Sequence, residues 1–273
     1  MEKNWRVIID GVCDGYYNMA KDEAIFQSYP HYKIPTLRIY RWNEPFVTLG
    51  YFQEPKKVIN TGAIVPYVRR ITGGAAILHG NDLTYSLSLS AEDLELTGSV
   101  KESYRILTSF LIEFYRRCGL TADYAQSSLP QKHELGRYGT FCFSSFEQYD
   151  INVTGKKIGG NAQKRKKQLI FQQGSIPFFI DHVRLKKTIK DIPDNIAEHT
   201  TGLYGILKEY PPLTELHRRL VDAFRKTFSV SVEYGNLTPQ EEELTQQLLT
   251  DKYLSGAWNL KRHAKTILVK QKD

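Results

Sequence analysis

The chain has 273 residues, of which 41% are hydrophobic and 25% are charged. This balance is typical of a globular protein and excludes disordered, collagen-like and coiled-coil chains. There are 37 Lys and Arg against 30 Asp and Glu, so the net charge is +7. A basic protein favours an acidic partner: nucleic acid, an anionic membrane, a phosphorylated ligand or an acidic protein.

Cysteine content and hydropathy indicate where the protein works. Cys13, Cys118 and Cys142 are too few and too scattered for a disulfide framework, and no Cys/His cluster has the spacing of a zinc site. The N-terminus lacks the apolar run of a signal peptide, and no stretch approaches the roughly 18 apolar residues of a membrane span. We therefore expect a soluble, cytoplasmic protein with neither a metal nor a membrane partner.

The first part of the chain predicts one helix, over residues 18–29, and several strands. Those strands are expected at residues 5–9, 36–42, 46–49, 64–69, 75–79 and 83–89. In the last of them Leu83, Tyr85, Leu87 and Leu89 alternate with Thr84, Ser86 and Ser88. This period of two predicts a strand with one buried face.

The second part of the chain is richer in helices. Residues 104–118 repeat apolar side chains every three or four positions, which predicts a helix. We expect Cys118 on its apolar face to pack in the core, and Gly119 fits the C-terminal end of this helix. Strands are expected at residues 148–153 and 168–177, on either side of a basic turn, and at 229–234. Further helices are expected at residues 181–189, 213–228 and 238–249.

The irregular succession of strands and helices favours an α/β fold of the α+β type, with a mixed β-sheet core and flanking helices. Pro211 and Pro212 predict a break in the chain. We therefore expect a catalytic domain over residues 1–210 and a small C-terminal helical extension, residues 211–273, packed on it.

The first segment that carries chemistry runs from Arg69 to His79. The adjacent Gly73 and Gly74 let the backbone approach a ligand, and two arginines just upstream, Arg69 and Arg70, suit an anion. A glycine hairpin with solvated arginines is the alternative. His79 either contacts the substrate or is a structural histidine at a strand end.

Two more segments contain reactive side chains. Residues 155–167 carry six basic residues and no acid. Glycines flank Lys157, so this lysine is suited to donate a hydrogen bond to a carbonyl. The alternative is that the whole run is a solvated basic loop. Cys142 follows a polar loop, residues 131–140, and a thiolate nucleophile there would need nearby positive charge. Cys13 lies in a glycine-bounded turn.

Taken in order, these motifs resemble the biotin/lipoate protein ligase and acyltransferase superfamily. The motifs are Arg-Arg-x-Thr-Gly-Gly-x-Ala-x-x-His at 69–79, Asp-Leu-Thr-Tyr-Ser at 82–86 and Gly-x-Lys-x-x-Gly-x-Ala-Gln-x-Arg at 155–165. The segment 18–24 is similar to the N-terminal helix of that family, and Lys252-Tyr253 with Trp258-Asn259 to its C-terminal signature. The resemblance implies a ligase-like catalytic domain.

Within the family, the chain is most like the cysteine-dependent octanoyltransferases. These carry a Cys-Phe pair shortly before the glycine-lysine motif, and Cys142-Phe143 precedes Gly155 by 13 positions. The resemblance implies transfer of octanoate from acyl carrier protein, through a thioester on Cys142, to a lysine of a lipoyl domain or of the glycine-cleavage H protein, with no cofactor. The composition of residues 131–141, with glycines at Gly136 and Gly139 that could act as hinges, further predicts a loop that moves to admit the acyl donor.

The resemblance assigns site residues as well. Cys142 and Lys157 would be catalytic, and the substrate-binding residues would be Arg69, Arg70, Thr72, Gly73, Gly74, His79, Tyr85, Gly160 and Ala162. The basic residues 164–167 would dock acidic partner proteins. Two alternatives share the fold: a lipoate–protein ligase that uses ATP and Mg²⁺, and an amidotransferase relaying acyl groups between lipoyl proteins. A nucleic-acid-binding module is disfavoured because no aromatic motif accompanies the basic run.

Overall fold

A mixed six-stranded sheet forms the centre of the computed structural model, which describes residues 3–128, 141–142 and 147–263. The strand order is β10-β11-β6-β2-β1-β12, and β12, β1 and β2 run parallel while the remaining neighbours are antiparallel. The strands are β1 (Asn4–Cys13), β2 (Thr36–Trp42), β6 (Asp82–Ser90), β10 (Gly160–Lys166), β11 (Leu169–Pro177) and β12 (Ser231–Tyr234). The predicted mixed sheet is confirmed.

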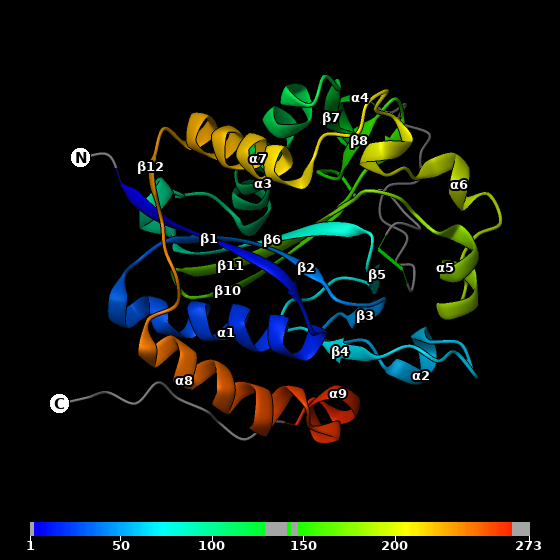
Figure 1. Ribbon diagram of the computed structural model, residues 1–273, viewed down its shortest axis with the longest axis horizontal. Coiled ribbons are helices and arrows are strands. Elements are labelled where there is room, and N and C mark those ends of the chain that lie inside the picture. Colours follow the sequence, from blue (N-terminus) through cyan, green and yellow to red (C-terminus); the bar gives the residue numbers. More distant parts are fainter. Residues whose placement is uncertain (1–2, 129–140, 143–146, 264–273) are drawn as a thin grey trace.

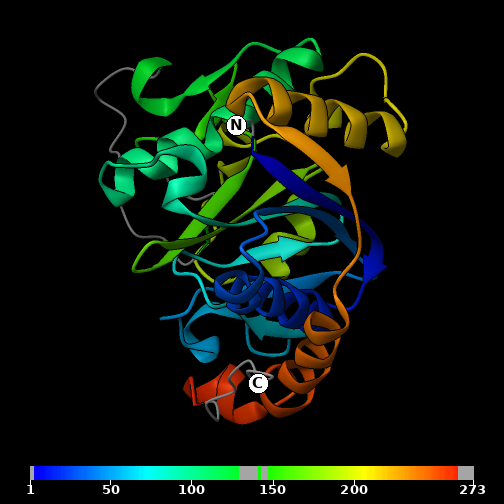
Figure 2. The same ribbon diagram turned by 90° about the vertical axis from the view of Figure 1, so that its left-hand side faces the viewer.

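Helices cover both faces of this sheet (Figures 1 and 2). The helices α3 (Val100–Arg117) and α7 (Leu213–Phe228) lie together on one face, and α1 (Gly15–Tyr32) and α8 (Pro239–Leu248) lie on the other. Gly119, with φ of +80°, follows α3, as expected for a helix C-terminus. No helix in the described ranges combines the length and the apolar character needed to cross a membrane.

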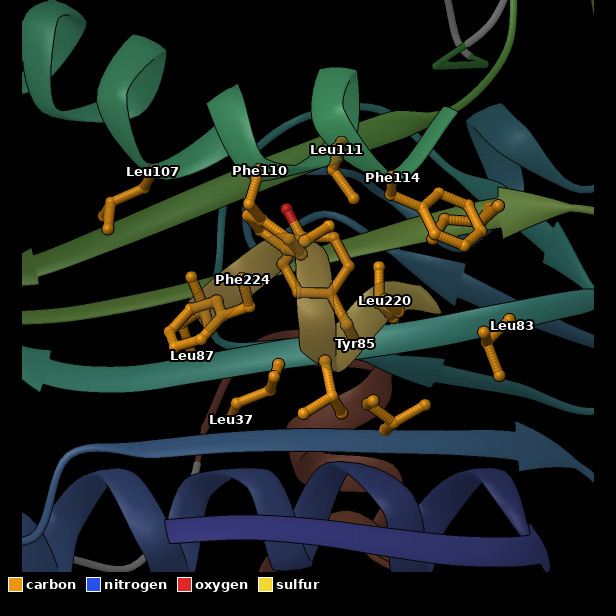
Figure 3. Packing of buried hydrophobic residues seen from close by; sticks show 14 of the residues in the cluster. Leu37, Leu83, Tyr85, Leu87, Leu107, Phe110, Leu111, Phe114, Leu220 and Phe224 are labelled. Atoms are coloured by element: carbon orange, nitrogen blue, oxygen red, sulfur yellow. The ribbon is translucent and has the colours of Figure 1, made fainter. Parts of the chain in front are cut away.

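The main hydrophobic core lies between the sheet and the pair α3 and α7 (Figure 3). The apolar residues predicted at helical spacing, among them Leu107, Leu111 and Phe114, point from α3 toward β6. Cys118 is buried in the same cluster, so its packing role is confirmed.

The prediction that residues 83–89 have one buried face is wrong, because β6 is a central strand that is buried along its whole length. Its buried polar residues are satisfied by side chains of α1 and of the neighbouring strand β2. The Ser86 hydroxyl donates to Asp22 Oδ1 (2.7 Å), and Trp42 Nε1 donates to Thr84 Oγ1 (2.9 Å). Buried hydroxyls in these pairs give the strand an alternating pattern without a solvent face.

Two small sheets gather at one end of the central sheet. One has the order β4-β3-β5 and comprises β3 (Phe46–Leu49), β4 (Tyr67–Arg69) and β5 (Ile77–His79); the other has the order β7-β8-β9 and comprises β7 (Ala122–Tyr124), β8 (Ile151–Val153) and β9 (Lys156–Lys157). The remaining described elements are α2 (Pro55–Val58), α4 (Ala125–Ser128), α5 (His182–Thr188), α6 (Ile196–His199), α9 (Gly256–Lys261), η1 (Ala91–Leu94), η2 (Leu203–Gly205) and η3 (Leu249–Tyr253).

Two predicted turns are strands in the structure. The basic run at residues 155–167 mostly forms β10, which pairs with β11 along its length, so the prediction of a basic turn is wrong. Cys13 is the last residue of β1 and not part of a turn. In both places backbone pairing with a neighbouring strand overrides the local glycine and charge signals.

The packing of the C-terminal part shows no boundary between two units at Pro211. Leu216, Leu220 and Phe224 of α7 belong to the main core, and β12 is the edge strand of the central sheet. Of the C-terminal elements in the described ranges, α8, η3 and α9 pack outside this unit, against α1 and β4. We therefore propose that the extension begins near Gly235 rather than at residue 211.

Candidate active site

Cys142 is held on the backbone of the glycine-rich loop. Its N–H donates to the Ala76 carbonyl (3.0 Å), and Ala76 forms an isolated parallel bridge with Phe141. The thiol packs on the first residue of β10: a Cβ added to Gly160 would lie 2.7 Å from Cys142 Sγ. A side chain there would displace the sulfur, so a glycine is required beside this thiol.

Lys157 is buried beside the same cysteine, with 1% of its surface exposed. Its Nζ donates to the Cys142 carbonyl (2.6 Å) and to Asp150 Oδ2 (2.5 Å). Asp150 Oδ2 also accepts the Glu147 N–H (2.6 Å). Burial lowers the pKa of Lys157, but Asp150, Cys142 and Glu147 together outweigh burial, and the resulting pKa is above the usual value. Lys157 is therefore a charged donor and not a general base.

The electrostatics of the thiol follow from these neighbours. Burial raises the pKa of Cys142 most, and Asp150 also raises it. Lys157 and Arg70 lower the pKa, but the net value stays above the ordinary one. The resting side chain is thus a thiol. The two cations are the groups that favour the thiolate when it forms.

Arg70 organises the glycine-rich loop from within. Its guanidinium donates to the carbonyls of Gly73 (2.7 Å) and Ala75 (2.9 Å), and to the Thr72 hydroxyl (3.0 Å). Gly74, with φ of +83°, completes the loop. Burial lowers the pKa of Arg70 to about 10, and no carboxylate among the described residues pairs with it. This buried cation can stabilise negative charge that develops beside it.

Arg69 points elsewhere and has a structural role. Its guanidinium donates to the carbonyls of Gly50, Tyr51 and Gln53 and to those of Trp258 and Asn259. It ties α9 to the loop after β3 and lines neither of the cavities described below.

His79 makes contacts with both ring nitrogens. Its Nδ1 lies 2.7 Å from Asp82 Oδ2, its Nε2 lies 3.0 Å from Thr48 Oγ1, and its ring stacks on Trp42 at 4.0 Å. Burial raises the pKa of Asp82, but His79 and further hydrogen bonds outweigh it and the net pKa is below the usual value. Asp82 is therefore an acceptor, and the geometry favours the structural interpretation of His79.

The structure brings some of the predicted site residues together and separates others. A small cavity of about 10 Å³ is lined by Arg70, His79, Cys142, Gly160 and Ala162 together with Tyr40, Trp42, Ile77, Thr84, Asn161, Gln173, Gly174 and Ser175. Tyr85 belongs to the main core instead (Figure 3), and its hydroxyl donates to Oδ1 of the pocket residue Asn161 (2.8 Å). The predicted hinges Gly136 and Gly139 lie outside the described residues.

Two residues of the site, Asp150 and Trp42, are not predicted by the sequence motifs. Asp150 precedes Lys157 by seven residues, on the other side of the β8–β9 hairpin, and an acid at that distance carries no motif signal of its own. Trp42 looks like an ordinary strand residue. No group of three or more His, Cys, Asp or Glu side chains in the described ranges is arranged to hold a metal ion.

The family model "Lipoyl protein ligase A/B catalytic domain" matches residues 14–225, which include Arg70, the glycine-rich loop, Cys142 and Lys157. The chain therefore belongs to that family, within the biotin/lipoate ligase superfamily.

Relatives of similar length extend the match to nearly the whole chain. Octanoyltransferase LipM of Halalkalibacterium halodurans is 32% identical over 275 residues, which cover 95% of this chain and 100% of that protein. Octanoyltransferase LipM of Anoxybacillus flavithermus is 34% identical over 278 residues, covering 96% and 100%. The Bacillus subtilis protein of the same name is 30% identical, covering 96% and 99%.

Solved structures share the fold. A bi-partite lipoate protein ligase from Thermoplasma acidophilum superposes with a TM-score of 0.78 at 22% identity, covering 97% of this chain and 99% of that one. A lipoate-protein ligase A bound with ATP gives a TM-score of 0.79 at 23% identity, covering 94% and 99%. The expected fold class is thereby confirmed.

Proposed function

We propose that this protein is an octanoyltransferase that moves an octanoyl group from acyl carrier protein, through a thioester on Cys142, to a lysine of a lipoyl domain or of the glycine-cleavage H protein. The full-length similarity to octanoyltransferases supports the reaction class. The observation that carries the mechanism is the contact set of Cys142, whose carbonyl accepts from the Lys157 ammonium and whose sulfur packs on Gly160.

In the first step the Cys142 sulfur attacks the thioester carbonyl of the donor. The new C–S bond forms, the C–S bond to the carrier breaks, and the proton lost by the Cys142 thiol ends on the leaving thiol. One thioester replaces another, so the step is close to balanced. No permanent proton acceptor is needed, in keeping with a Lys157 that is already protonated.

In the second step the neutral amine of the acceptor lysine attacks the acyl-enzyme. The amide bond forms, the C–S bond to Cys142 breaks, and the amine proton returns to the sulfur. Amide formation from a thioester is downhill, so this route uses no nucleotide. Lys157, Arg70 and backbone N–H groups near Gly160 stabilise the oxyanion in both steps.

The test is an acyl-transfer assay without ATP. The wild-type protein is mixed with octanoyl-acyl carrier protein and a lipoyl domain, and intact mass spectrometry follows the enzyme and the acceptor. We expect one octanoyl group on Cys142 and then on the acceptor, and neither with Cys142→Ser. Strict dependence on ATP and free lipoate, unaffected by Cys142→Ser, would contradict the proposal and indicate a ligase.

A parallel reaction tests the relay alternative. Octanoyl-H protein replaces the carrier protein as donor, and the same two masses are followed. Faster acylation of Cys142 from the H protein than from the carrier protein would assign the enzyme to amide-to-amide relay.

We further propose a cytoplasmic location, since Cys13, Cys118 and Cys142 are all free, as in a reducing compartment.

A further inference from the structure

The small pocket that contains Cys142 also contains a buried polar atom without a partner. Gln173 of β11 lines this pocket and is only 7% exposed. Its side-chain oxygen, Oε1, is buried and accepts no hydrogen bond from any residue that the structure describes. An unpaired buried acceptor costs free energy, so its retention in a reactive pocket indicates a ligand that donates to it. The oxyanion cannot be that ligand, because it is itself an acceptor.

The strand register places Gln173 on the same side of the sheet as the thiol. Ser175 of β11 lies opposite Gly160, on which the Cys142 sulfur packs. Gln173 precedes Ser175 by two residues, so the two side chains share a face and lie roughly 7 Å apart at about 3.3 Å per residue. That face is the one toward α1, since Ser86, opposite Gln173, donates to a carboxylate of that helix.

A separation of this size suits a reacting group held between the two side chains. A carbonyl carbon bonded to the Cys142 sulfur, a nitrogen about 3 Å from that carbon and a hydrogen bond of about 3 Å to Oε1 together span it. The pocket has a volume of about 10 Å³, which holds one group about the size of a water molecule. The head of a primary amine has that size, whereas an alkyl chain does not.

A larger cavity, of about 200 Å³, adjoins the pocket and shares Trp42, Ile77, His79 and Ser175 with it. The charged side chains on its wall are mostly acidic. They are Glu44, Asp82, Asp181 and Arg184. A wall of this charge attracts a lysine side chain and repels an anion, so the space next to the pocket suits an incoming amine.

We propose that Gln173 recognises the attacking amine of the acceptor lysine in the second step of the reaction. Its Oε1 accepts one N–H of the neutral amine and directs the nitrogen lone pair toward the acyl carbon on Cys142. The C–N bond forms, the C–S bond to Cys142 breaks, one amine proton ends on the sulfur, and the other stays as the N–H of the amide product. Gln173 itself takes up no proton. The inference rests on the proposed function and adds the residue that distinguishes an amine from other nucleophiles.

The test compares two nucleophiles that attack the same acyl-enzyme. Octanoyl-Cys142 enzyme is formed from octanoyl-acyl carrier protein, freed of donor, and mixed with a lipoyl domain or with dithiothreitol, which attacks as a thiolate and brings no N–H. Gln173→Met keeps the size of the side chain but removes the acceptor. We expect it to slow transfer to the lipoyl domain about five- to tenfold, the loss of one neutral hydrogen bond. The reaction with dithiothreitol and the first acylation should change less than about twofold.

Stability gives a second and independent readout. Gln173→Met removes an unpaired buried acceptor, so its melting temperature should equal or exceed that of the wild type. Gln172→Met is the matched control, because this neighbouring glutamine points to the other side of β11 and bonds Gln163 and Tyr85 there. The control should lower the melting temperature and leave the ratio of the two transfer rates unchanged.

Three results would overturn the inference: wild-type transfer to the lipoyl domain in Gln173→Met, equal losses with both nucleophiles, or a lower melting temperature in that variant. The last would show that Oε1 is already paired in the free protein. Failure of the proposed function is seen earlier, since wild-type Cys142 would then not be acylated. If the wild-type acyl-enzyme forms and reacts with the lipoyl domain while Gln173→Met behaves like wild type, the function stands and the inference fails.

Discussion

At the scale of single residues, the site depends on an acid that has no part in the bond changes. Lys157 is buried, and a buried lysine keeps its proton only beside an anion. Asp150 supplies that anion at 2.5 Å and fixes the ammonium against the Cys142 carbonyl. We regard Asp150 as a positioning residue.

Asp150→Asn should therefore change the pH dependence of acylation. Without the carboxylate, Lys157 loses the group that most strongly opposes the effect of burial, so its pKa falls and the ammonium is lost at lower pH. The alkaline limb of the rate of Cys142 acylation should move to lower pH, with a rate at neutral pH at least about tenfold below wild type. Stopped-flow acylation across pH measures this, and Asp123→Asn is the control, because Asp123 is the exposed residue of β7. An unmoved alkaline limb would mean that Asp150 is only structural.

Gly160→Ala probes the space around the sulfur. The added Cβ would meet Cys142 Sγ at 2.7 Å, so the thiol must move from its place between Ala76 and β10. We expect acylation to fall at least about tenfold because a reacting atom is misplaced. Gly11→Ala is the matched control, since a Cβ there meets nothing within 4 Å. The readout is single-turnover acylation with the melting temperature alongside. Equal rates in the two variants would show that the sulfur has room to shift.

Adjacent residues show how far the sequence predicts such a site. The motif identifies Arg69 and Arg70 together, but successive residues at a strand end face opposite sides. Arg70 therefore holds the glycine loop beside Cys142, and Arg69 holds the C-terminal helix. The order of the motifs indicates Cys142 and Lys157. The difference between the two arginines, and the pairing of Lys157 with Asp150, depend on three-dimensional neighbours that no local pattern encodes.

At the scale of elements, local periodicity predicts what each segment is, and its neighbours determine what it faces. The helical spacing of α3 and α7 leads directly to the main core. The alternation in β6 does not mark a solvent face, because α1 carries buried polar side chains such as Asp22 that satisfy the strand hydroxyls. A helix of this kind cannot be distinguished from a surface helix by composition alone.

The C-terminal extension is attached to α1 by one buried ionic contact. Lys252 donates to both carboxylate oxygens of Glu23 (2.8 and 2.6 Å), and the Tyr253 hydroxyl donates to the same group (2.5 Å). The following helix α9 then binds Arg69 through Trp258 and Asn259. This chain of contacts links the extension to the loop that abuts Gly74.

Glu23→Gln tests that attachment. The change keeps the shape but leaves the Lys252 ammonium buried without its carboxylate, which costs about 3 kcal/mol of unfolding free energy. Urea denaturation measures the loss, and Glu242→Gln, exposed on α8, should change stability by less than about 0.5 kcal/mol. Equal stabilities of the two variants would show that the contact contributes little to holding the extension.

At the scale of the whole molecule, the net charge of +7 is spread over distant places. Lys157 belongs to the proposed active site, and Lys164 is half-buried, with a pKa that burial lowers. Lys166 and Lys167 are exposed at the far end of β10, six and seven residues from Gly160. At about 3.3 Å per residue, the strand separates them from Cys142 by roughly 20 Å.

The sequence predicts that residues 164–167 dock the acidic partner, and Lys166 and Lys167 are the exposed members of that run. A docked acidic protein would lie directly against these two lysines, at a site roughly 20 Å from the thiol, and salt would weaken the attraction. The double variant Lys166→Glu, Lys167→Glu should therefore raise KM for octanoyl-acyl carrier protein at low salt by at least about threefold, with a smaller effect in 0.15 M salt. Steady-state assays at two ionic strengths measure this. An unchanged KM at both ionic strengths would show that the carrier docks elsewhere on the molecule.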